Sequence, residues 1–403
     1  MSDENYGQGQ VAVITGGTAG IGRATAELLA RKGYMLALIA RGEEGLAKAK
    51  RELSPITRIE TYSCDVRDNA KMQETADAIA RDLGGIDVWV NNAMLTIIAP
   101  FKDISDSDFN AVFDGCFKGY VHGMRAALRH MPLRGHIVNV SSALGYRSVP
   151  LQSAYCAAKH AINGLSASVR SEMIHDGRDV EISIITLPGL NTPQFDWSKV
   201  QMPNSPRPAP PVYEPSTAAE GVFKAIRDKS REVMVGRAAI GLTFAQMAVP
   251  DTLDHQLAKQ GYEGQQDDDE SANKNPDQGI IYEPMHDERY YNARGSYGGE
   301  AESSALTLDG DTARASIFGL GALAATGLGI LIGATAGRAR ARREIEADQR
   351  DYAHAEQVRR SNGLSDRADE LRYDQPVIGD RRMIGTRSET RTDLAVQGAT
   401  ERD

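Results

Sequence analysis

The sequence predicts an α/β domain built on a doubly wound parallel sheet, with helices on both faces in three layers. Over residues 1 to about 264, short apolar runs alternate with longer segments of helical periodicity. Strands that alternate with helices form βαβ units, whose strands pair in parallel. A glycine-rich turn also joins the first strand to the first helix, where such sheets commonly bind a ligand.

Each expected element follows from a short local pattern. The expected strands lie within residues 11–17, 34–41, 57–66, 86–93, 134–145 and 180–189, with a last one ending near 236. The expected helices cover residues 20–33, 69–85, 106–131 and 152–177, with another starting near 215. Gly33 ends the first helix, because glycine tolerates the left-handed cap conformation. Residues 242–266 add a helical extension that is expected to cover the substrate side.

The composition is that of an ordinary globular protein. The 403 residues are 41% hydrophobic and 25% charged, with a net charge of -9, which argues against a nucleic-acid partner. Cys64, Cys116 and Cys156 are widely spaced, which predicts reduced thiols and no metal site. The polar and acidic start "MSDENYGQGQ" lacks the parts of a secretory signal, so a cytoplasmic catalytic domain is expected.

The composition changes after the catalytic domain expected over residues 1–264. Residues 265–314 are acidic and poor in hydrophobic side chains, which predicts a disordered linker. Residues 315–337 form an uncharged apolar block rich in Gly and Ala, and residues 338–403 are polar and charged.

The apolar block raises the question of membrane association. It is about long enough to span a bilayer, but the arginines that follow it favour a cytoplasmic side there. One span cannot also keep the preceding enzyme in the cytoplasm. A membrane hairpin, an interfacial helix and an oligomerising soluble helix all remain open, so membrane association through residues 315–337 stays undecided.

The residues "TGGTAGIG" at 15–22 follow the first strand and open the first helix. Gly16, Gly20 and Gly22 let the backbone turn and approach a pyrophosphate, whose charge meets the helix N-terminus. At the end of the second strand the chain has Arg41, whereas an acid there would bind the ribose 2′-hydroxyl of NAD. An arginine can pair with a 2′-phosphate, so the sequence favours NADP(H) over NAD(H).

Tyr155 and Lys159 stand four residues apart in "QSAYCAAKH", so they share a helix face. Such a pair by itself is usually a packed aromatic ring with a neighbouring lysine. A nearby cation would lower the phenol pKa from about 10, which suits general acid/base catalysis. The pair is expected on the helix after the fifth strand, near the edge where such sheets bind ligands.

Together these motifs resemble the short-chain dehydrogenase/reductase family, which has a Rossmann-type fold, over roughly residues 9–240. Besides the glycine-rich turn and "YCAAK", the matching pieces are "CDV" at 64–66, "NNA" at 91–93, "VNVSS" at 138–142 and "LPGLNT" at 187–192. The resemblance implies an oxidoreductase that interconverts an alcohol and a ketone or aldehyde by hydride transfer. Tyr155 would then be the general acid/base, Lys159 would lower its pKa and hold the nicotinamide ribose, and Ser142, in preference to Ser141, would bind the substrate oxygen.

The resemblance also implies the cofactor contacts. The predicted cofactor-binding residues are Gly16, Thr18, Gly20, Ile21, Gly22, Arg41, Asp65, Val66, Asn92, Ala93, Tyr155, Lys159, Pro188, Gly189 and Thr192. Two positions depart from the family pattern. Met94 stands where the family usually has glycine. Cys116 stands where an asparagine often helps to hold a water beside the lysine, and a thiol hydrogen-bonds poorly, which puts the proton relay in doubt.

The substrate is less well specified than the cofactor. Apolar side chains in the segments expected to border the pocket are Leu144, Tyr146, Leu151, Leu190, Phe195 and Trp197. They predict a small apolar alcohol or carbonyl substrate, although ordinary core positions would give the same pattern. The family suggests a homodimer or homotetramer. The alternative function, from another class, is a non-catalytic dinucleotide-binding sensor or scaffold protein; a membrane-tethered reductase of lipid-like substrates is a third hypothesis.

Overall fold

The computed structural model describes residues 5–131, 133–267, 273, 275, 277, 279–319, 350 and 357. The chain divides into two units, Met1–Ala322 and Leu323–Asp403, and the fold below belongs to the first. Residues 310–319 are helical; the rest of the apolar block at 315–337, on which the membrane hypotheses depend, lies outside the described residues. Within the described part of the chain, no helix is both long enough and apolar enough to cross a bilayer.

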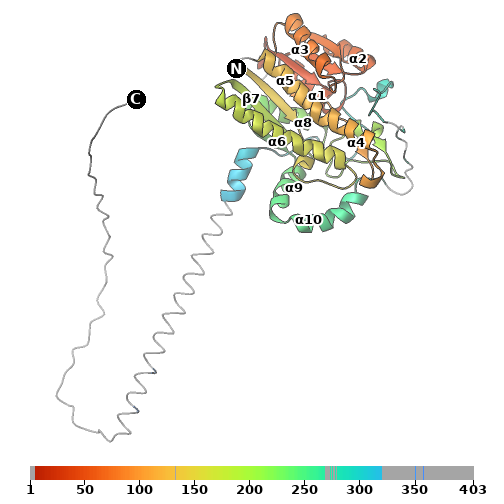
Figure 1. The fold of residues 1–403 in the computed structure, drawn as a ribbon, viewed down its shortest axis with the longest axis vertical. Helices are drawn as coiled ribbons and strands as arrows, with labels where there is room; N and C mark the ends of the chain where they lie inside the picture. Colours follow the sequence, from red (N-terminus) through yellow and green to blue (C-terminus); the bar gives the residue numbers. More distant parts are fainter. Residues whose placement is uncertain are drawn as a thin grey trace, which may run out of the picture. The chain divides into compact units, whose positions relative to one another are not determined.

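The first unit is built on one large sheet, which confirms the predicted fold class (Figure 1). Its strand order is β10-β9-β7-β6-β4-β1-β2-β3. The strands are β1 (Val11–Thr15), β2 (Met35–Ala40), β3 (Ile59–Ser63), β4 (Val88–Asn91), β6 (Arg134–Val140), β7 (Asp179–Thr186), β9 (Glu232–Val235) and β10 (Thr307–Asp309). All neighbours pair in parallel except β10, which runs antiparallel to β9. A second, two-stranded sheet joins β5 (Ile97–Ile98) to β8 (Lys199–Val200).

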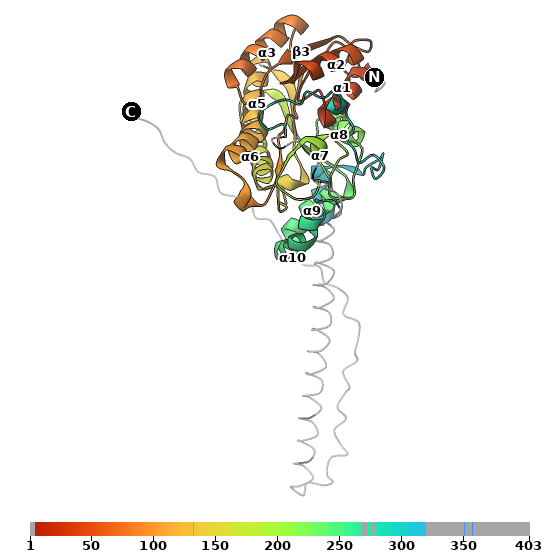
Figure 2. The ribbon, with the colours of Figure 1, turned by 90° about the vertical axis from the view of Figure 1, so that its right-hand side faces the viewer.

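Helices cover both faces of the large sheet (Figures 1 and 2). They are α1 (Gly20–Arg31), α2 (Glu43–Leu53), α3 (Asn69–Leu83), α4 (Asp106–Phe113), α5 (Gly119–His130), α6 (Ser153–His175), α7 (Gln194–Trp197), α8 (Pro215–Asp228), α9 (Arg237–Ala248) and α10 (Pro250–Gln256). Successive side chains of a strand point to opposite faces. Ala12 and Ile14 accordingly pack with α1 and α8, whereas Val11 and Val13 pack in the cluster on the α3 and α5 side.

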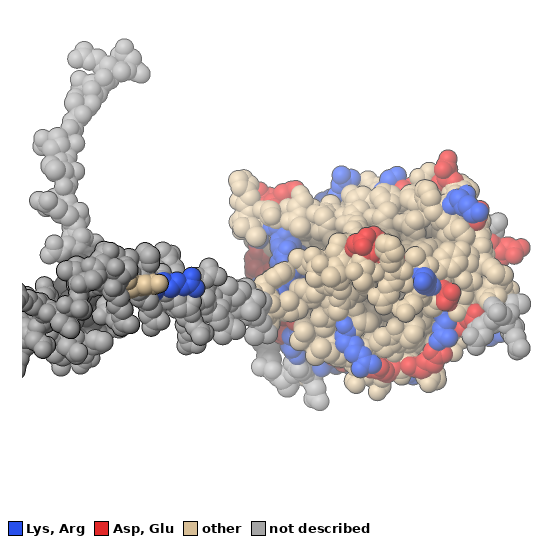
Figure 3. Space-filling model, turned by 90° about the horizontal axis from the view of Figure 1, so that it is seen from below, with Lys and Arg blue, Asp and Glu red and all other residues tan. Residues whose placement is uncertain are grey.

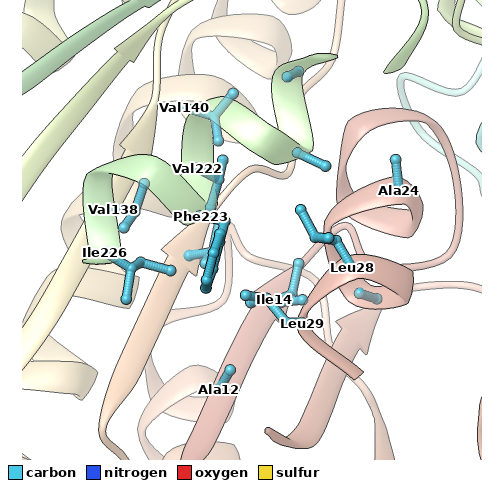
Figure 4. Packing of buried hydrophobic residues seen from close by; sticks show 14 of the residues in the cluster. Ala12, Ile14, Ala24, Leu28, Leu29, Val138, Val140, Val222, Phe223 and Ile226 are labelled. Carbon is cyan, nitrogen blue, oxygen red and sulfur yellow. The ribbon is translucent and has the colours of Figure 1, made fainter. Parts of the chain in front are cut away.

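Two packed helices form the core on the first of these faces. Leu28 and Leu29 of α1 meet Val222 and Phe223 of α8 above the β1 side chain Ile14 (Figure 4). Burial of one such large apolar side chain contributes about 1.5–3 kcal/mol. This packing fixes α1 against the sheet, and it therefore fixes the glycine-rich turn from which α1 begins.

Two helical features differ from the expectation. The helix α2 was not predicted, because charged residues and Gly45 obscure its apolar stripe. Its side chains Leu46, Ala49 and Leu53 are nevertheless buried. The single helix expected over 106–131 is interrupted by a π-helical turn at Asp114–Lys118. Such turns are rare and occur frequently at functional sites.

The prediction of a disordered linker over residues 265–314 is wrong for the residues described there. Residues 307–309 form β10 on the edge of the large sheet, and Ile281 and Tyr291 are only 0% and 5% exposed. A few apolar side chains in a polar segment provide the anchors, which an average over the composition hides. Figure 2 shows blue-green segments of this region crossing the body of the domain.

The helical extension after β9 consists of α9 and α10 and packs near the start of α6. Arg147 donates to Gln246 on α9 (2.8 Å) and to Asp254 on α10 (2.5 Å). The Gln152 side chain, just before α6, donates to Gln265 at 2.6 Å. On the face seen in Figure 3, acidic and basic side chains are interspersed among uncharged ones.

Candidate active site

The glycine-rich turn between β1 and α1 forms a cradle in which side chains have no room. Gly16 and Gly20 have φ angles of +66° and +55°, a conformation that glycine adopts without strain. A Cβ at Gly22 would lie 2.2 Å from the Gly16 carbonyl oxygen. The cradle lies at the N-terminus of α1, so the residues present fit the phosphates of a dinucleotide.

A cleft opens beside this cradle. The predicted cofactor residues that line it are Gly16, Thr18, Gly20, Ile21, Arg41, Asp65, Val66, Asn92, Ala93 and Thr192. Met94 and Leu95 add apolar surface to the same wall. Gly22 lies behind the turn, against the Gly16 carbonyl. Pro188 and Gly189 are not brought to the lining, because they back onto Gly236 and Ala209.

The apolar residues expected around the substrate fall mostly into the core. Trp197 lines the cleft. Leu151 and Phe195 belong to a separate buried cluster, and Leu190 belongs to the main core. The Tyr146 hydroxyl donates to a buried carboxylate at 2.8 Å. Leu144 does not line the cleft either, so Trp197 is the one residue of the predicted six that does.

Ser142 and Tyr155 meet where β6 ends and α6 begins. The Ser142 hydroxyl is a hydrogen-bond partner of the Tyr155 phenol and accepts from the Leu144 amide at 3.1 Å. The Tyr155 ring packs in the apolar cluster that also contains Leu95 of the cleft wall. The neighbouring Ser141 donates its hydroxyl to Asn163 at 2.8 Å instead.

The acidity of Tyr155 differs from the expectation that Lys159 lowers it. Burial raises the pKa of the Tyr155 phenol, and the hydrogen bond from Ser142 opposes the rise. The Lys159 ammonium nitrogen lies 5.3 Å from the centroid of the Tyr155 ring. In the state described, desolvation therefore outweighs the cation, and the phenol is neutral at neutral pH.

Lys159 is 2% exposed, and its ammonium group is held by the body of the domain. It donates to the Val140 carbonyl oxygen at 2.6 Å and to the Tyr120 hydroxyl at 3.3 Å. Burial lowers the pKa of Lys159 from 10.5 to about 8. Tyr120 also donates to the Val140 carbonyl, at 2.8 Å, so all three groups form one buried network.

Tyr120 is a site residue that the sequence argument missed. It lies four residues after Cys116, and that spacing was the one signal available, because residues i and i+4 share a helix face. Cys116 itself is fully buried within the π-helical turn. Its thiol donates to the Leu95 carbonyl at 3.0 Å and accepts from the Leu95 amide at 3.2 Å. The Cys116 thiol is therefore bonded to Leu95 of the cleft wall. The side chain that contacts the Lys159 ammonium group is that of Tyr120.

Arg41 and Asp65 stand together at the ends of β2 and β3, where the sequence predicts the adenosine end of the cofactor. Arg67, which was not predicted, donates to both Asp65 carboxylate oxygens, at 2.6–3.0 Å. Burial acts to raise the pKa of Asp65, but the hydrogen bonds from Arg67 and the charge of Arg41 outweigh it and lower the pKa. Arg41 donates to three backbone carbonyls of residues 280–282.

Metal ligands are not grouped in the part of the chain that the structure describes. No three or more His, Cys, Asp or Glu side chains there are placed to hold a metal ion. Cys64, Cys116 and Cys156 are buried and free. Burial raises the pKa of all three thiols, so each is a neutral thiol at neutral pH.

Comparisons with known proteins point to one family. A family model described as short chain dehydrogenase matches residues 10–201. YxnA of Bacillus subtilis, an uncharacterized oxidoreductase, is 30% identical over 261 residues, which cover 64% of this chain and 73% of the relative. The NADPH-dependent pterin aldehyde reductase of Arabidopsis thaliana is 36% identical over 168 residues, which cover 41% of this chain and 69% of the relative.

A solved structure supports the fold independently. The short chain dehydrogenase from Burkholderia cenocepacia J2315, in complex with NADP, superposes with a TM-score of 0.50 at 23% identity. The match covers 55% of this chain and 92% of that chain. Family match, relatives and fold all concern the domain that carries the glycine cradle and the Ser142, Tyr155 and Lys159 side chains. The chain therefore belongs to the short-chain dehydrogenase/reductase family of nucleotide-binding oxidoreductases.

Proposed function

We propose that this protein is an NADP(H)-dependent oxidoreductase that interconverts a small apolar alcohol and the corresponding ketone or aldehyde, with Tyr155 as general acid/base. The observation that carries the proposal is that Ser142 and Lys159 both lie beside Tyr155, whose ring packs in the apolar cluster that contains Leu95 of the cleft wall. When bound, the nicotinamide cofactor supplies or accepts the hydride. The side chains orient the substrate oxygen and move its proton.

The proton step follows from the state of the phenol. Because burial raises its pKa, Tyr155 is a neutral donor at neutral pH. During carbonyl reduction it gives its proton to the substrate oxygen, which the Ser142 hydroxyl also binds. The Ser142 hydrogen bond lowers the pKa of the phenol and so stabilises the phenolate that results. In the reverse direction the phenolate takes the alcohol proton.

Lys159 acts on the phenolate through its charge. Its ammonium group lies next to the ring, and a cation stabilises a nearby phenolate. Val140 and Tyr120 hold that ammonium group by accepting its hydrogen bonds. Tyr120 is therefore proposed as the residue that positions Lys159, which answers the doubt raised by Cys116.

The pH dependence of reduction should report the charge of Lys159. Its pKa in the folded protein is lowered to about 8, so the side chain is charged below that pH and neutral above it. We expect kcat/KM for carbonyl reduction to be level below pH 8 and to fall above it, because the phenolate formed at Tyr155 loses its cation. Steady-state rates from pH 6 to 10 check this. A profile that stays level to pH 10, or a step that persists in Lys159→Met, would contradict it.

The preference for NADP(H) rests on Arg41, which ends β2 and lines the cleft. Replacement of Arg41 by alanine should weaken NADPH binding about 10- to 100-fold, because a hydrogen bond to a charged group contributes about 1.5–3 kcal/mol. NADH binding should not weaken, since NADH lacks the 2′-phosphate. Fluorescence titration of both cofactors measures the two dissociation constants. Tighter binding of NADH than NADPH by the wild type would reverse the assignment of Arg41.

The function itself is tested by one cuvette experiment on the full chain. NADPH is titrated first, and a panel of apolar ketones and aldehydes is then added while NADPH consumption is followed. Binding with turnover of an apolar carbonyl is the expected result. The apolar side chains of Met94, Leu95 and Trp197, which line the cleft, support that choice of panel. Tight binding without turnover over a broad panel would favour the dinucleotide-sensing alternative.

Assembly and location complete the proposal. A homodimer or homotetramer through the long helices is proposed from the family, and the exposed Ile174 on α6 (74% exposed) supports an apolar contact there. Light scattering of the purified chain tests the oligomeric state.

The catalytic domain is proposed to use cytoplasmic NADP(H). Cell fractionation decides whether residues 315–337 add membrane association; a wholly soluble full-length chain would exclude the tethered alternative.

A further inference from the structure

A segment from the C-terminal part of the chain crosses the cofactor cleft. We call residues 279–297 the strap. At its start, Ile281 is fully buried in the cluster that contains Leu95, and the Tyr282 hydroxyl donates to Asp108 at 3.0 Å. At its end, the Tyr297 amide donates to the Asn191 side chain at 2.9 Å. Between these anchors, Pro284, Met285 and Tyr291 line the cleft itself.

The strap occupies donors that the proposed function assigns to the cofactor phosphates. The Gly20 amide, at the first residue of α1, donates to the Asn292 carbonyl oxygen at 2.8 Å. The Arg41 guanidinium donates to the carbonyls of Ile280, Ile281 and Tyr282. A peptide carbonyl and a phosphate oxygen are both acceptors, so they compete for the same N–H groups.

A tight contact with α2 holds the middle of the strap. A Cβ added at Gly45 would lie 2.5 Å from two ring carbons of Tyr291. The Lys48 ammonium group donates to the Glu288 carbonyl (3.4 Å) and to the Asn292 side chain (3.3 Å). Glycine is a poor helix former, and its use at position 45 is explained by the space that the Tyr291 ring needs.

We propose that the strap is an internal competitor of the cofactor, which binds fully only when the strap releases Arg41 and the Gly20 amide. This inference rests on the proposed function, because it takes the cleft to be the NADP(H) site. Because only molecules with an open strap bind NADPH fully, the apparent affinity is the affinity of the open form multiplied by the fraction of molecules that are open. The strap thereby sets both the affinity for NADPH and the accessibility of the Arg41 side chain that recognises the 2′-phosphate.

A single methyl group tests the proposal. The variant Gly45→Ala favours the α2 helix and displaces the Tyr291 ring, so it should open the strap. If the open form is a minor state of about 10% or less, NADPH should bind about tenfold more tightly or better. The matched control is Gly241→Ala on α9, where an added Cβ meets nothing within 4 Å. A second variant, Tyr291→Ala, removes the ring and should act in the same direction.

Unchanged or weaker NADPH binding in both Gly45→Ala and Tyr291→Ala would overturn the proposal, and weaker binding would mean that the strap clamps a bound cofactor. If NADPH and NADH bind to neither the wild type nor the variants, the proposed function fails and the strap proposal fails with it. Equal binding by wild type and variants fails the strap proposal alone.

Hydrogen exchange on the full chain gives a readout that needs neither activity nor a variant. In the closed state the Gly295 amide donates to the Asn191 carbonyl (3.2 Å) and the Tyr297 amide is also bonded, which slows their exchange. On addition of NADPH, peptides from the strap should exchange faster while peptides from residues 15–22 exchange more slowly. Slower exchange in both regions would show closure over the cofactor and contradict competition.

Discussion

The variant Tyr155→Phe is expected to lower kcat for carbonyl reduction by about 10²- to 10⁴-fold, which is the usual contribution of a positioned general acid. The change removes one oxygen and keeps the ring that packs in the apolar cluster around Leu95. Without the phenol, the substrate oxygen retains the Ser142 hydroxyl but has no proton donor at that place. The dissociation constant of NADPH should change by less than about fivefold, because one lost hydrogen bond contributes about 1 kcal/mol.

A matched variant separates this chemistry from general damage. Tyr62→Phe on β3 removes a hydroxyl that donates to Asp82 at 2.8 Å, in an exposed hydrogen bond outside the cleft. It should keep the kcat of the wild type. Single-turnover rates at saturating NADPH, measured for Tyr155→Phe, Tyr62→Phe and wild type, give the comparison. If Tyr155→Phe retains more than about a tenth of the wild-type rate, another group donates the proton.

The elements of the catalytic domain were predictable because their signals are local. Val11 to Ile14 alternate between two faces, and the glycine pattern that follows specifies a turn into a helix. The three residues proposed to carry the chemistry are likewise marked by spacing, and packing brings Ser142 beside Tyr155 from another element. For these features a short window of sequence contains most of the physical cause.

The strap was not predictable from such windows, because its anchors are distant in sequence. Ile281 is buried by residues of the cluster around Leu95 and Cys116, although the segment that contains Ile280 and Ile281 is mostly polar. The partners of Arg41 are backbone carbonyls. Every residue has a backbone carbonyl, so the side-chain sequence gives no sign of which ones Arg41 will bind. A compositional average over residues 265–314 therefore gave a disordered linker where a few side chains and main-chain bonds give order.

The acidity of Tyr155 illustrates a second limit. The sequence shows a lysine four residues away, and a cation lowers a phenol pKa. The opposing effect, desolvation, depends on residues from several elements that close around the ring. The structure shows that this effect is the larger one. Sequence spacing identified both groups of the pair and missed Tyr120, which holds the second of them.

The other large effect is expected at Gly22. An added Cβ in Gly22→Ala would lie 2.2 Å from the Gly16 carbonyl oxygen and 2.5 Å from the Asn92 amide nitrogen. Neither group can move away without a cost in free energy. The Gly16 carbonyl is part of the backbone, and the Asn92 amide donates to the carbonyls of Thr15 (3.0 Å) and Gly16 (3.2 Å). Overpacking of this kind costs about 1–3 kcal/mol, and relief requires the whole turn to move.

Because that turn is the proposed phosphate cradle, Gly22→Ala should abolish dinucleotide binding even if the domain still folds. A ligand at 100 times its dissociation constant stabilises the native state by about 2.7 kcal/mol, so wild type should show a clear rise in Tm with NADPH. The variant should melt lower and show no rise, whereas the Gly241→Ala control keeps it. A full NADPH-dependent rise in the Tm of Gly22→Ala would mean that the phosphates bind elsewhere. The added methyl group fits only if the backbone of the turn moves, and that movement destroys the cradle.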